Sequence, residues 1–461
     1  MLSKYRKLIL FLMRAGFIAG LIGIFYVGWR LGYEEVVYYF YGYVLVLMLY
    51  GIVLLAFLGV YGGLRFGAYR LGNLIFSCYL AILLSDLVVY FMLSLIVYRM
   101  LPVLDIILIA AVQCLFATGS CWAINKAYYA LRTARMVVAI CGDDPNDRMT
   151  IDKMRSIREQ YHIVRIIDAD LSLKEICRAL EPYESVLIGT IDPKKRHAML
   201  DWCYRAGKRI NLIPAPMDII LNNAQQTHIM DTPVLLCRNR ELSPEQNVIK
   251  RSIDIALSLI GLIVMSPLMG LIALAIRLQD GGPALYRQER LTKDGQSFFI
   301  FKFRTMIVDA EKGMKPGYII AAEGDPRITP VGKLLRTLRL DELPQMINIL
   351  KGDMSVVGPR PERPEVYREC KKTLHDFDLR LRMRAGLTGY AQIYGRYNTG
   401  LRDKLNMDLF YIENYSLIQD IRLILLTVKI LFMKESTQGR VDTDVSGAQP
   451  PAADGQEKAA D

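Results

Sequence analysis

Apolar residues fill four long stretches in the first part of the chain. Each stretch exceeds the roughly 20 residues that an α-helix needs to cross the hydrocarbon core of a bilayer. We therefore predict a membrane protein whose residues 1–131 form a four-helix transmembrane bundle. The stretches cover about residues 8–29, 37–61, 72–98 and 101–125.

Basic residues flank these stretches unevenly. They lie before the first stretch, between the second and third, and after the fourth, whereas the opposite loops hold little beyond Arg30 and Arg99. The positive-inside rule therefore places both ends of the bundle in the cytoplasm. Two acids, Asp86 and Asp105, fall within or near the spans, as functional groups or as interhelix or interfacial hydrogen-bonding residues. The flanking cations are Lys4, Arg6, Lys7, Arg65, Arg70, Lys126, Arg132 and Arg135.

The pattern changes over residues 132–247, where short apolar strands alternate with amphipathic helices. This alternation predicts a parallel, Rossmann-like α/β domain. A nucleotide site would need a glycine-rich first turn, but the turn here is "CGDDPND", whose carboxylates repel phosphate. We therefore predict a structural or dimerising module without a working nucleotide site. The strands are "MVVAI", "YHIVRII", "SVLIG" and "RINLIP", and the helices cover 148–160, 172–181 and 193–206.

A further apolar helix, 253–278, opens the last unit, residues 248–435. By length it could cross the membrane as a kinked helix, or it could dip into one leaflet and return. Ser266-Pro267 near its middle favours a break, since proline removes a backbone donor and serine can bond a freed backbone group. A full crossing would place everything after residue 280 outside the cell, so topology favours the re-entrant form. The tail, 436–461, is predicted to be disordered.

Composition agrees with a membrane location. The chain is 52% hydrophobic and carries a net charge of +11, which with these spans fits an anionic membrane surface better than nucleic acid. Its eight cysteines form no CxxC pair, as expected for reduced thiols facing a cytoplasm.

Candidate chemistry centres on "LDELPQMINILKG", which contains Asp341 and Glu342. The apolar spacing predicts a short helix with Asp341 and Glu342 at its N-terminus, Pro344 in its first turn and its end at Gly352. Carboxylates are favoured at a helix N-terminus, and neighbouring ones point about 100° apart, so one could attack phosphorus while the other holds a divalent metal. An ordinary acidic helix cap is the alternative.

Cations surround this pair in the sequence. "FKFRTM" places Lys302 and Arg304 on one strand face, a glycine–proline turn presents Arg360, and a glycine-rich loop ends in Arg396. Arginines beside flexible turns are suited to bind a diphosphate. Alternatively, the same cations bind acidic lipids at the membrane surface.

Four motifs in this unit resemble those of the bacterial polyprenyl-phosphate hexose-1-phosphate transferases, the monotopic phosphoglycosyl transferases. The resemblance covers about residues 248–433, and the preceding bundle and degenerate Rossmann-like domain resemble the long form of the family. It implies a mostly α-helical catalytic domain with a re-entrant helix broken at Ser266-Pro267. The motifs are "KFRTM", "LDELPQ", "GDMSVVGPRP" and "GLTGYAQIYGR".

The resemblance also implies a reaction. Asp341 would attack the β-phosphate of a UDP-sugar and release UMP, and undecaprenyl phosphate would then take the phosphosugar from the aspartyl intermediate. Glu342 would ligate Mg2+. This would be the first membrane step of exopolysaccharide, capsule or O-antigen synthesis, on the cytoplasmic face of the bacterial inner membrane. Residues matching phosphate-contacting or neighbouring site positions are Lys302, Arg336, Arg360, Arg396 and Asp420.

Partners follow from the same resemblance: membrane lipids, a second copy in a homodimer, and downstream glycosyltransferases, with no nucleic acid. The sequence departs from the family where it reads Arg384-Ala385-Gly386 instead of Arg-Pro-Gly, at Tyr390, where a tryptophan is common, and over the variable segment 311–327. A membrane scaffold for polysaccharide assembly, without catalysis, is the competing interpretation.

Overall fold

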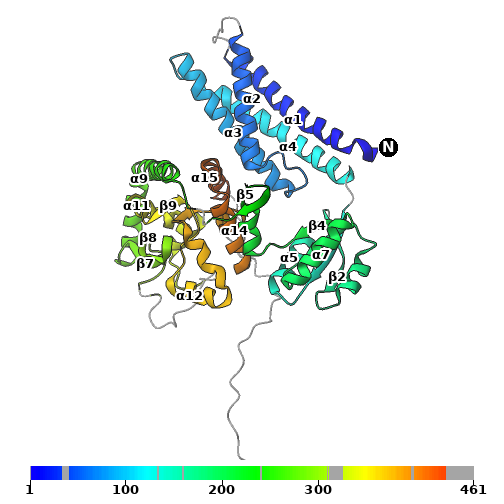
Figure 1. The fold of residues 1–461 in the computed structure, drawn as a ribbon. Helices are drawn as coiled ribbons and strands as arrows, with labels where there is room; N and C mark the ends of the chain where they lie inside the picture. Colours follow the sequence, from blue (N-terminus) through cyan, green and yellow to red (C-terminus); the bar gives the residue numbers. More distant parts are fainter. Residues whose placement is uncertain are drawn as a thin grey trace, which may run out of the picture.

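The computed structural model forms a helical bundle above two further domains that lie side by side (Figure 1). The predicted tail, Arg132, Arg396 and most of the segment 311–327 lie outside the residues it describes. Those residues are 2–33, 41–131, 134–157, 160–238, 241–308, 310, 325–395 and 399–431.

The four predicted apolar helices are present, and each is long and apolar enough to cross a membrane. Their packed faces are rich in aromatic rings, such as Phe25 stacked on Tyr50 with centroids 3.8 Å apart. Large apolar side chains elsewhere on them, including Phe11 and Leu115, stay exposed, as lipid-facing residues would. The helices are α1 (Leu2–Gly32), α2 (Gly42–Tyr61), α3 (Leu71–Ile96) and α4 (Val103–Leu131).

The predicted parallel α/β sheet is also present, with strand order β2-β1-β3-β4. Each of its helices begins at a side-chain cap: Asp144, Ser172 and Asp192 accept bonds from backbone N–H groups two or three residues after the cap. The first helix therefore begins three residues before the predicted start at 148. The elements are β1 (Arg135–Cys141), α5 (Pro145–Arg155), β2 (Tyr161–Asp168), α6 (Leu173–Leu180), β3 (Ser185–Ile188), α7 (Pro193–Arg205) and β4 (Arg209–Leu212).

A short helix and a hairpin that the sequence analysis did not predict follow the sheet. Helix α8 (Pro216–Asn222) packs on the C-terminal domain, and β5 (Gln225–Ile229) pairs antiparallel with β6 (Thr232–Leu236).

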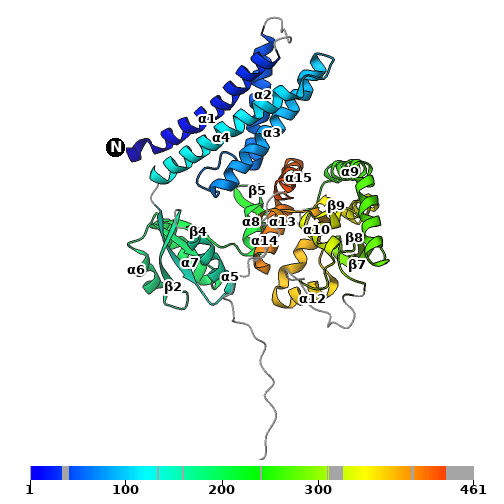
Figure 2. The same cartoon turned by 180° about the vertical axis from the view of Figure 1, so that it is seen from behind.

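Helix α9 (Pro244–Asp280) begins at a capping box formed by Ser243 and Gln246, and contains Pro267. Proline cannot donate to the carbonyl of Ile263 four residues earlier, and the Ser266 hydroxyl donates to that carbonyl instead, at 2.9 Å. The predicted role of the serine is therefore confirmed. The helix bends, and its two limbs run in different directions (Figure 2).

The rest of the C-terminal domain consists of helices around two small sheets, an antiparallel β7–β8 pair and a parallel β9–β10 pair. Its elements are β7 (Leu285–Leu291), η1 (Lys293–Gly295), β8 (Ser297–Phe303), α10 (Pro330–Thr337), η2 (Leu340–Glu342), α11 (Gln345–Lys351), β9 (Met354–Val357), α12 (Pro364–Thr373), η3 (His375–Arg382), β10 (Ala385–Thr388), α13 (Tyr390–Tyr394), α14 (Leu401–Glu413) and α15 (Leu417–Leu431).

Helix α15 fastens this domain to the bundle. Lys429 is buried there and donates to the Ser77 hydroxyl at 2.6 Å and to the Tyr61 carbonyl at 3.3 Å, while Leu426 joins the bundle's hydrophobic core. The domain thus lies at the end of the bundle that holds the α2–α3 loop and the end of α4 (Figure 1).

Candidate active site

The predicted dyad, Asp341 and Glu342, lies in a 3-10 turn between α10 and α11. Helix α11 ends at Gly352 in the left-handed conformation, as predicted, but it begins only after Pro344. Pro344 has no N–H, so the bonds around it are of the shorter 3-10 type, such as Leu343 N–H to Leu340 O at 3.3 Å. The dyad therefore precedes the helix instead of forming its first turn.

The backbone just before the dyad is strained. Arg339 has a φ of 53°, in the left-handed region that residues other than glycine rarely adopt. Strain of this kind persists only where the surrounding structure enforces it, and it is concentrated at functional sites. It directs the chain from the end of α10 into the acidic turn.

Two cations hold Glu342. Lys302 Nζ on β8 lies 2.9 Å from Glu342 Oε1, and Arg360, from the loop after β9, donates to the same oxygen at 3.1 Å. The Glu342 side chain is only 14% exposed. Burial acts to raise the pKa of Glu342, but Lys302 and Arg360 outweigh it, so this pKa lies well below its usual range. Lys302 and Arg360 therefore favour the ionised form of Glu342.

Asp341 is in a different state. It makes no hydrogen bond or ion pair with any residue that the structure describes. Burial and then the neighbouring Glu342 raise its pKa, while Lys302, Arg336 and Arg360 act in the opposite direction. A carboxylate of raised basicity that is not engaged elsewhere, beside fixed cations, is suited to attack an electrophile.

Arg336 approaches this cluster from α10. Its Nε donates to the Thr305 hydroxyl at 2.8 Å, and its charge acts on Asp341. The structure thus brings together five of the predicted site residues: Lys302, Arg336, Asp341, Glu342 and Arg360. Arg396 lies outside the described residues.

The structure corrects two predictions, one for an acidic residue and one for a basic residue. Asp420, on α15, is buried between Lys250 Nζ at 2.7 Å and the Tyr411 hydroxyl at 2.6 Å, so its carboxylate secures α9 to α15 instead of facing a phosphate. Arg304 follows the end of β8 and pairs with Asp280 at the end of α9, so it does not share the role of Lys302.

The sequence analysis also missed buried charges that support the site from behind. Lys250 donates to the carbonyl of Val357, and Asp254 accepts from the Val356 N–H at 2.9 Å, so the first turns of α9 hold β9 in place. Lys250 and Asp254 are four residues apart at the start of an apolar helix. A pair of charges on the same face of such a helix was the available signal.

Glu342 is the carboxylate that would hold a divalent metal. Mg2+ is usually held by one or two carboxylates together with substrate phosphates and water. Both cation contacts of Glu342 use Oε1, so Oε2 would be the metal ligand. Among the described residues there is no cluster of three or more acidic, histidine or cysteine side chains that would hold a metal without a substrate.

Comparison with known proteins places the site in a matched region. Residues 245–434 match the family described as bacterial sugar transferase. The chain is 38% identical over 192 residues to the UDP-N-acetylgalactosamine-undecaprenyl-phosphate N-acetylgalactosaminephosphotransferase of Aeromonas hydrophila, covering 41% of this chain and 45% of that protein.

Two further relatives extend the comparison. The undecaprenyl-phosphate galactose phosphotransferase of Salmonella typhimurium is 34% identical over 242 residues, half of each chain. The exopolysaccharide production protein ExoY of Sinorhizobium fredii is 34% identical over 202 residues, 41% of this chain and 87% of ExoY. The chain thus spans about half the length of the first two relatives and most of the third.

Proposed function

Because the chain belongs to the bacterial sugar transferase family, we propose that it transfers a sugar-1-phosphate from a UDP-sugar to undecaprenyl phosphate. The single observation that supports this reaction best is the contrast within the dyad. Asp341 has a raised pKa and no hydrogen-bond partner among the described residues, while the adjacent Glu342 is held as an anion by Lys302 and Arg360.

The first step forms a bond from an Asp341 carboxylate oxygen to the β-phosphorus of the donor. The bond between that phosphorus and the oxygen bridging to the α-phosphate breaks, and UMP leaves with the oxygen. Lys302, Arg336 and Arg360 stabilise the charge that develops on the phosphate oxygens. In the second step a phosphate oxygen of undecaprenyl phosphate attacks the same phosphorus, and the Asp341 carboxylate is released.

Glu342 holds Lys302 and Arg360 toward the reacting phosphates, which spares the enzyme the cost of ordering them during the reaction. Mg2+, when bound by Glu342 and the donor phosphates, would neutralise phosphate charge. Burial around Asp341 limits access of water, which would otherwise hydrolyse the phosphoaspartyl intermediate.

We also propose that α9 enters and leaves the same leaflet, which keeps the dyad on the cytoplasmic side of the inner membrane. The bend of α9, which contains Pro267, and the exposed apolar side chains on both limbs, such as Ile260 and Leu271, support it. A cysteine at Gln279 should then react with an impermeant maleimide from the same side as one at Ser243. Labelling from opposite sides would establish a crossing helix.

The experiment that tests the reaction measures UMP release by the purified full-length chain with undecaprenyl phosphate, Mg2+ and a panel of UDP-sugars. Wild type should release UMP with at least one donor, and Asp341→Asn should lower the rate by about 10³-fold or more. Asp376→Asn, on an exposed residue, is the matched control. Equal rates in wild type and Asp341→Asn would remove Asp341 as nucleophile, and no release of UMP by folded wild type would favour the scaffold interpretation.

A homodimer and downstream glycosyltransferases remain part of this proposal.

A further inference from the structure

The carboxyl ends of β1 and β3 meet at the middle of the α/β sheet. The order β2-β1-β3-β4 reverses between them, and parallel α/β sheets bind ligands at such a point. Here the edge is lined by side chains: Asp147 after β1 is buried and accepts bonds from the Thr190 N–H at 2.7 Å and hydroxyl at 3.1 Å. No glycine-rich phosphate loop occupies this place.

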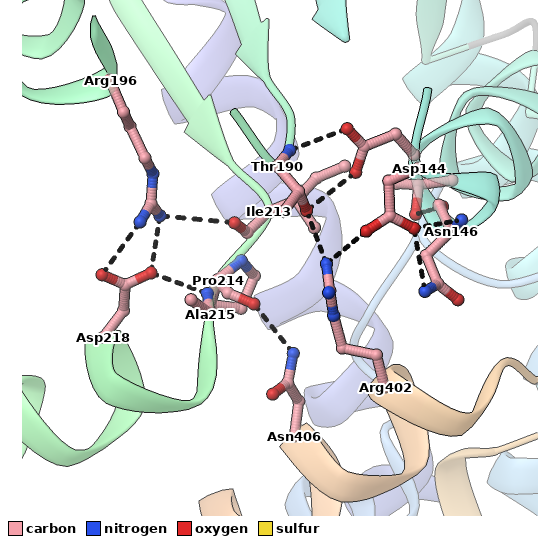
Figure 3. Close-up of polar contacts among 12 residues, drawn as sticks. Asp144, Asn146, Thr190, Arg196, Ile213, Pro214, Ala215, Asp218, Arg402 and Asn406 are labelled. Carbon is pink, nitrogen blue, oxygen red and sulfur yellow. Dashed lines mark hydrogen bonds and ion pairs between the residues drawn. The ribbon is translucent and has the colours of Figure 1, made fainter. Parts of the chain in front are cut away.

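Arg402 reaches this edge from the second residue of α14 (Figure 3). Its NH1 donates to Asp144 Oδ2 and, at 3.0 Å, to the Thr190 hydroxyl. The two charged side chains are mostly shielded, with Arg402 25% and Asp144 17% exposed. A guanidinium from another domain therefore fills the position that a ligand holds in sheets of this kind.

Other polar contacts fix the same helix along its length. Asn406, one turn after Arg402, donates to the carbonyl of Pro214 at 2.8 Å (Figure 3). Lys153 on α5 pairs with Asp403 at 2.8 Å. Three polar residues in the first two turns of α14, Arg402, Asp403 and Asn406, thus bind the α/β domain.

The fit of the two surfaces is close and partly apolar. A Cβ atom at Gly400, the N-cap of α14, would come within 2.3 Å of Asn146 Oδ1, so a larger residue there would have to displace the Asn146 side chain. Ile219 on α8 shares a hydrophobic core with Leu405 and Leu409 of α14.

The same helix also reaches the loop that carries Arg360. Asp408, two residues after Asn406, pairs with Arg380 at 2.8 Å, and both side chains are buried. Arg380 NH2 in turn donates to the carbonyl oxygen of Arg360 at 2.9 Å. The Arg360 guanidinium binds Glu342. Continuous contacts therefore run from the sheet edge to the dyad.

We propose that the edge formed by Asp144 and Thr190 is an intramolecular docking site for α14, and that this docking positions Arg360 through Asp408 and Arg380. The α/β domain then contributes to donor binding although it binds no donor itself. The part of this inference that concerns donor affinity rests on the proposed function, whereas the docking does not.

Asp144→Asn tests the docking with little other disturbance. Asparagine caps a helix as well as aspartate does, so the bond from the Asn146 N–H is kept while the charge facing Arg402 is lost. Hydrogen exchange of the full-length chain in detergent should be faster in peptides covering 401–408 and 358–363. Arg402→Gln should give the same pattern and Arg402→Lys a weaker one.

Arg205→Gln is the matched control, because it removes an arginine that pairs with Asp201 inside α7, away from α14. Exchange in 401–408 and 358–363 should be unchanged in this variant. Faster exchange in 401–408 alone, or in neither peptide, for both Asp144→Asn and Arg402→Gln would overturn the positioning of Arg360.

Steady-state kinetics supply the functional readout. Arg402→Gln should raise KM for the UDP-sugar about three- to tenfold with kcat changed less than about twofold, and Arg402→Lys should recover part of the loss. The double variant Asp144→Asn/Arg402→Gln should be no worse than Arg402→Gln, because the two changes remove one contact. Additive effects, or a fall in kcat alone, would contradict the inference. Wild type without UMP release would refute the proposed function, and hydrogen exchange would still decide the docking.

Discussion

Two acidic turns of this chain look alike in sequence and differ in the structure. "DDP" at 143–145 and "DELP" at 341–344 each place two carboxylates just before a proline and a helix. In the first turn, Asp144 caps α5 and binds Arg402. In the second, Glu342 is bound by two cations, while Asp341 makes no hydrogen bond or ion pair with the residues that the structure describes.

The difference shows what separates a structural acid from a candidate nucleophile. Asp144 uses its oxygens to satisfy backbone and guanidinium donors, which stabilises the fold and leaves little capacity for chemistry. At the second turn one carboxylate, Glu342, takes up the cations, so its neighbour keeps its lone pairs. The unengaged acid of the second turn is shielded beside fixed cations, whereas Asp143 of the first turn is fully exposed.

After the loss of Asp341 itself, the largest effect should come from removing the negative charge of Glu342. Glu342→Gln keeps the size of the side chain but removes the charge that orders Lys302 and Arg360, so kcat should fall by about 10²-fold or more. Asp144→Asn, the equivalent change in the first turn, should leave kcat nearly unchanged. UMP release measures both. A similar loss of kcat in the two variants would show that the two acidic turns do not differ in their contribution to catalysis.

A second change separates stability from chemistry. Asp420→Asn removes the carboxylate that pairs with buried Lys250 at 2.7 Å, which should lower the free energy of unfolding by about 3–5 kcal/mol. Asp143→Asn is the control, since Asp143 is fully exposed and lies 3.5 Å from Arg148. Denaturant unfolding in detergent should separate the two variants. An Asp420→Asn protein as stable as wild type would show that this pair does not secure α9.

The smallest expected effect is a shift in pH dependence. Asp341 must be ionised to attack, and its pKa is raised by burial and by Glu342, so kcat should fall with acid at a pH above the usual aspartate range. Lys302 lowers this pKa, so Lys302→Gln should move the acid limb of kcat to higher pH. Lys293→Gln, at an exposed turn, should not. If kcat of Lys302→Gln fell at the same acid pH as kcat of wild type, the fall would not report ionisation of Asp341.

Much of the fold was predictable because it depends on local pattern. Apolar stretches long enough to cross a bilayer predicted the four helices, and the alternation of strands and helices predicted the parallel sheet. Gly352 predicted the end of α11, and Ser266-Pro267 predicted the interrupted backbone hydrogen bond in α9. Each of these signals lies within a few residues of the feature that it determines.

The remaining contacts join residues far apart in the sequence. Asp420 pairs with Lys250, 170 residues away, and Arg402 meets Asp144, 258 residues away. Local spacing carries no information about such pairs. Arg304 was grouped with Lys302 by strand alternation, but the strand ends at Phe303 and Arg304 turns to Asp280.

In the proposed reaction, Asp341 forms a covalent phosphosugar intermediate. The most direct test omits undecaprenyl phosphate and measures UMP released in the first turnover of full-length protein with an accepted UDP-sugar. We expect a burst of one UMP per active chain, a matching mass increase on the peptide containing Asp341, and neither in Asp341→Asn. UMP release that requires undecaprenyl phosphate, with no mass change on that peptide, would contradict it.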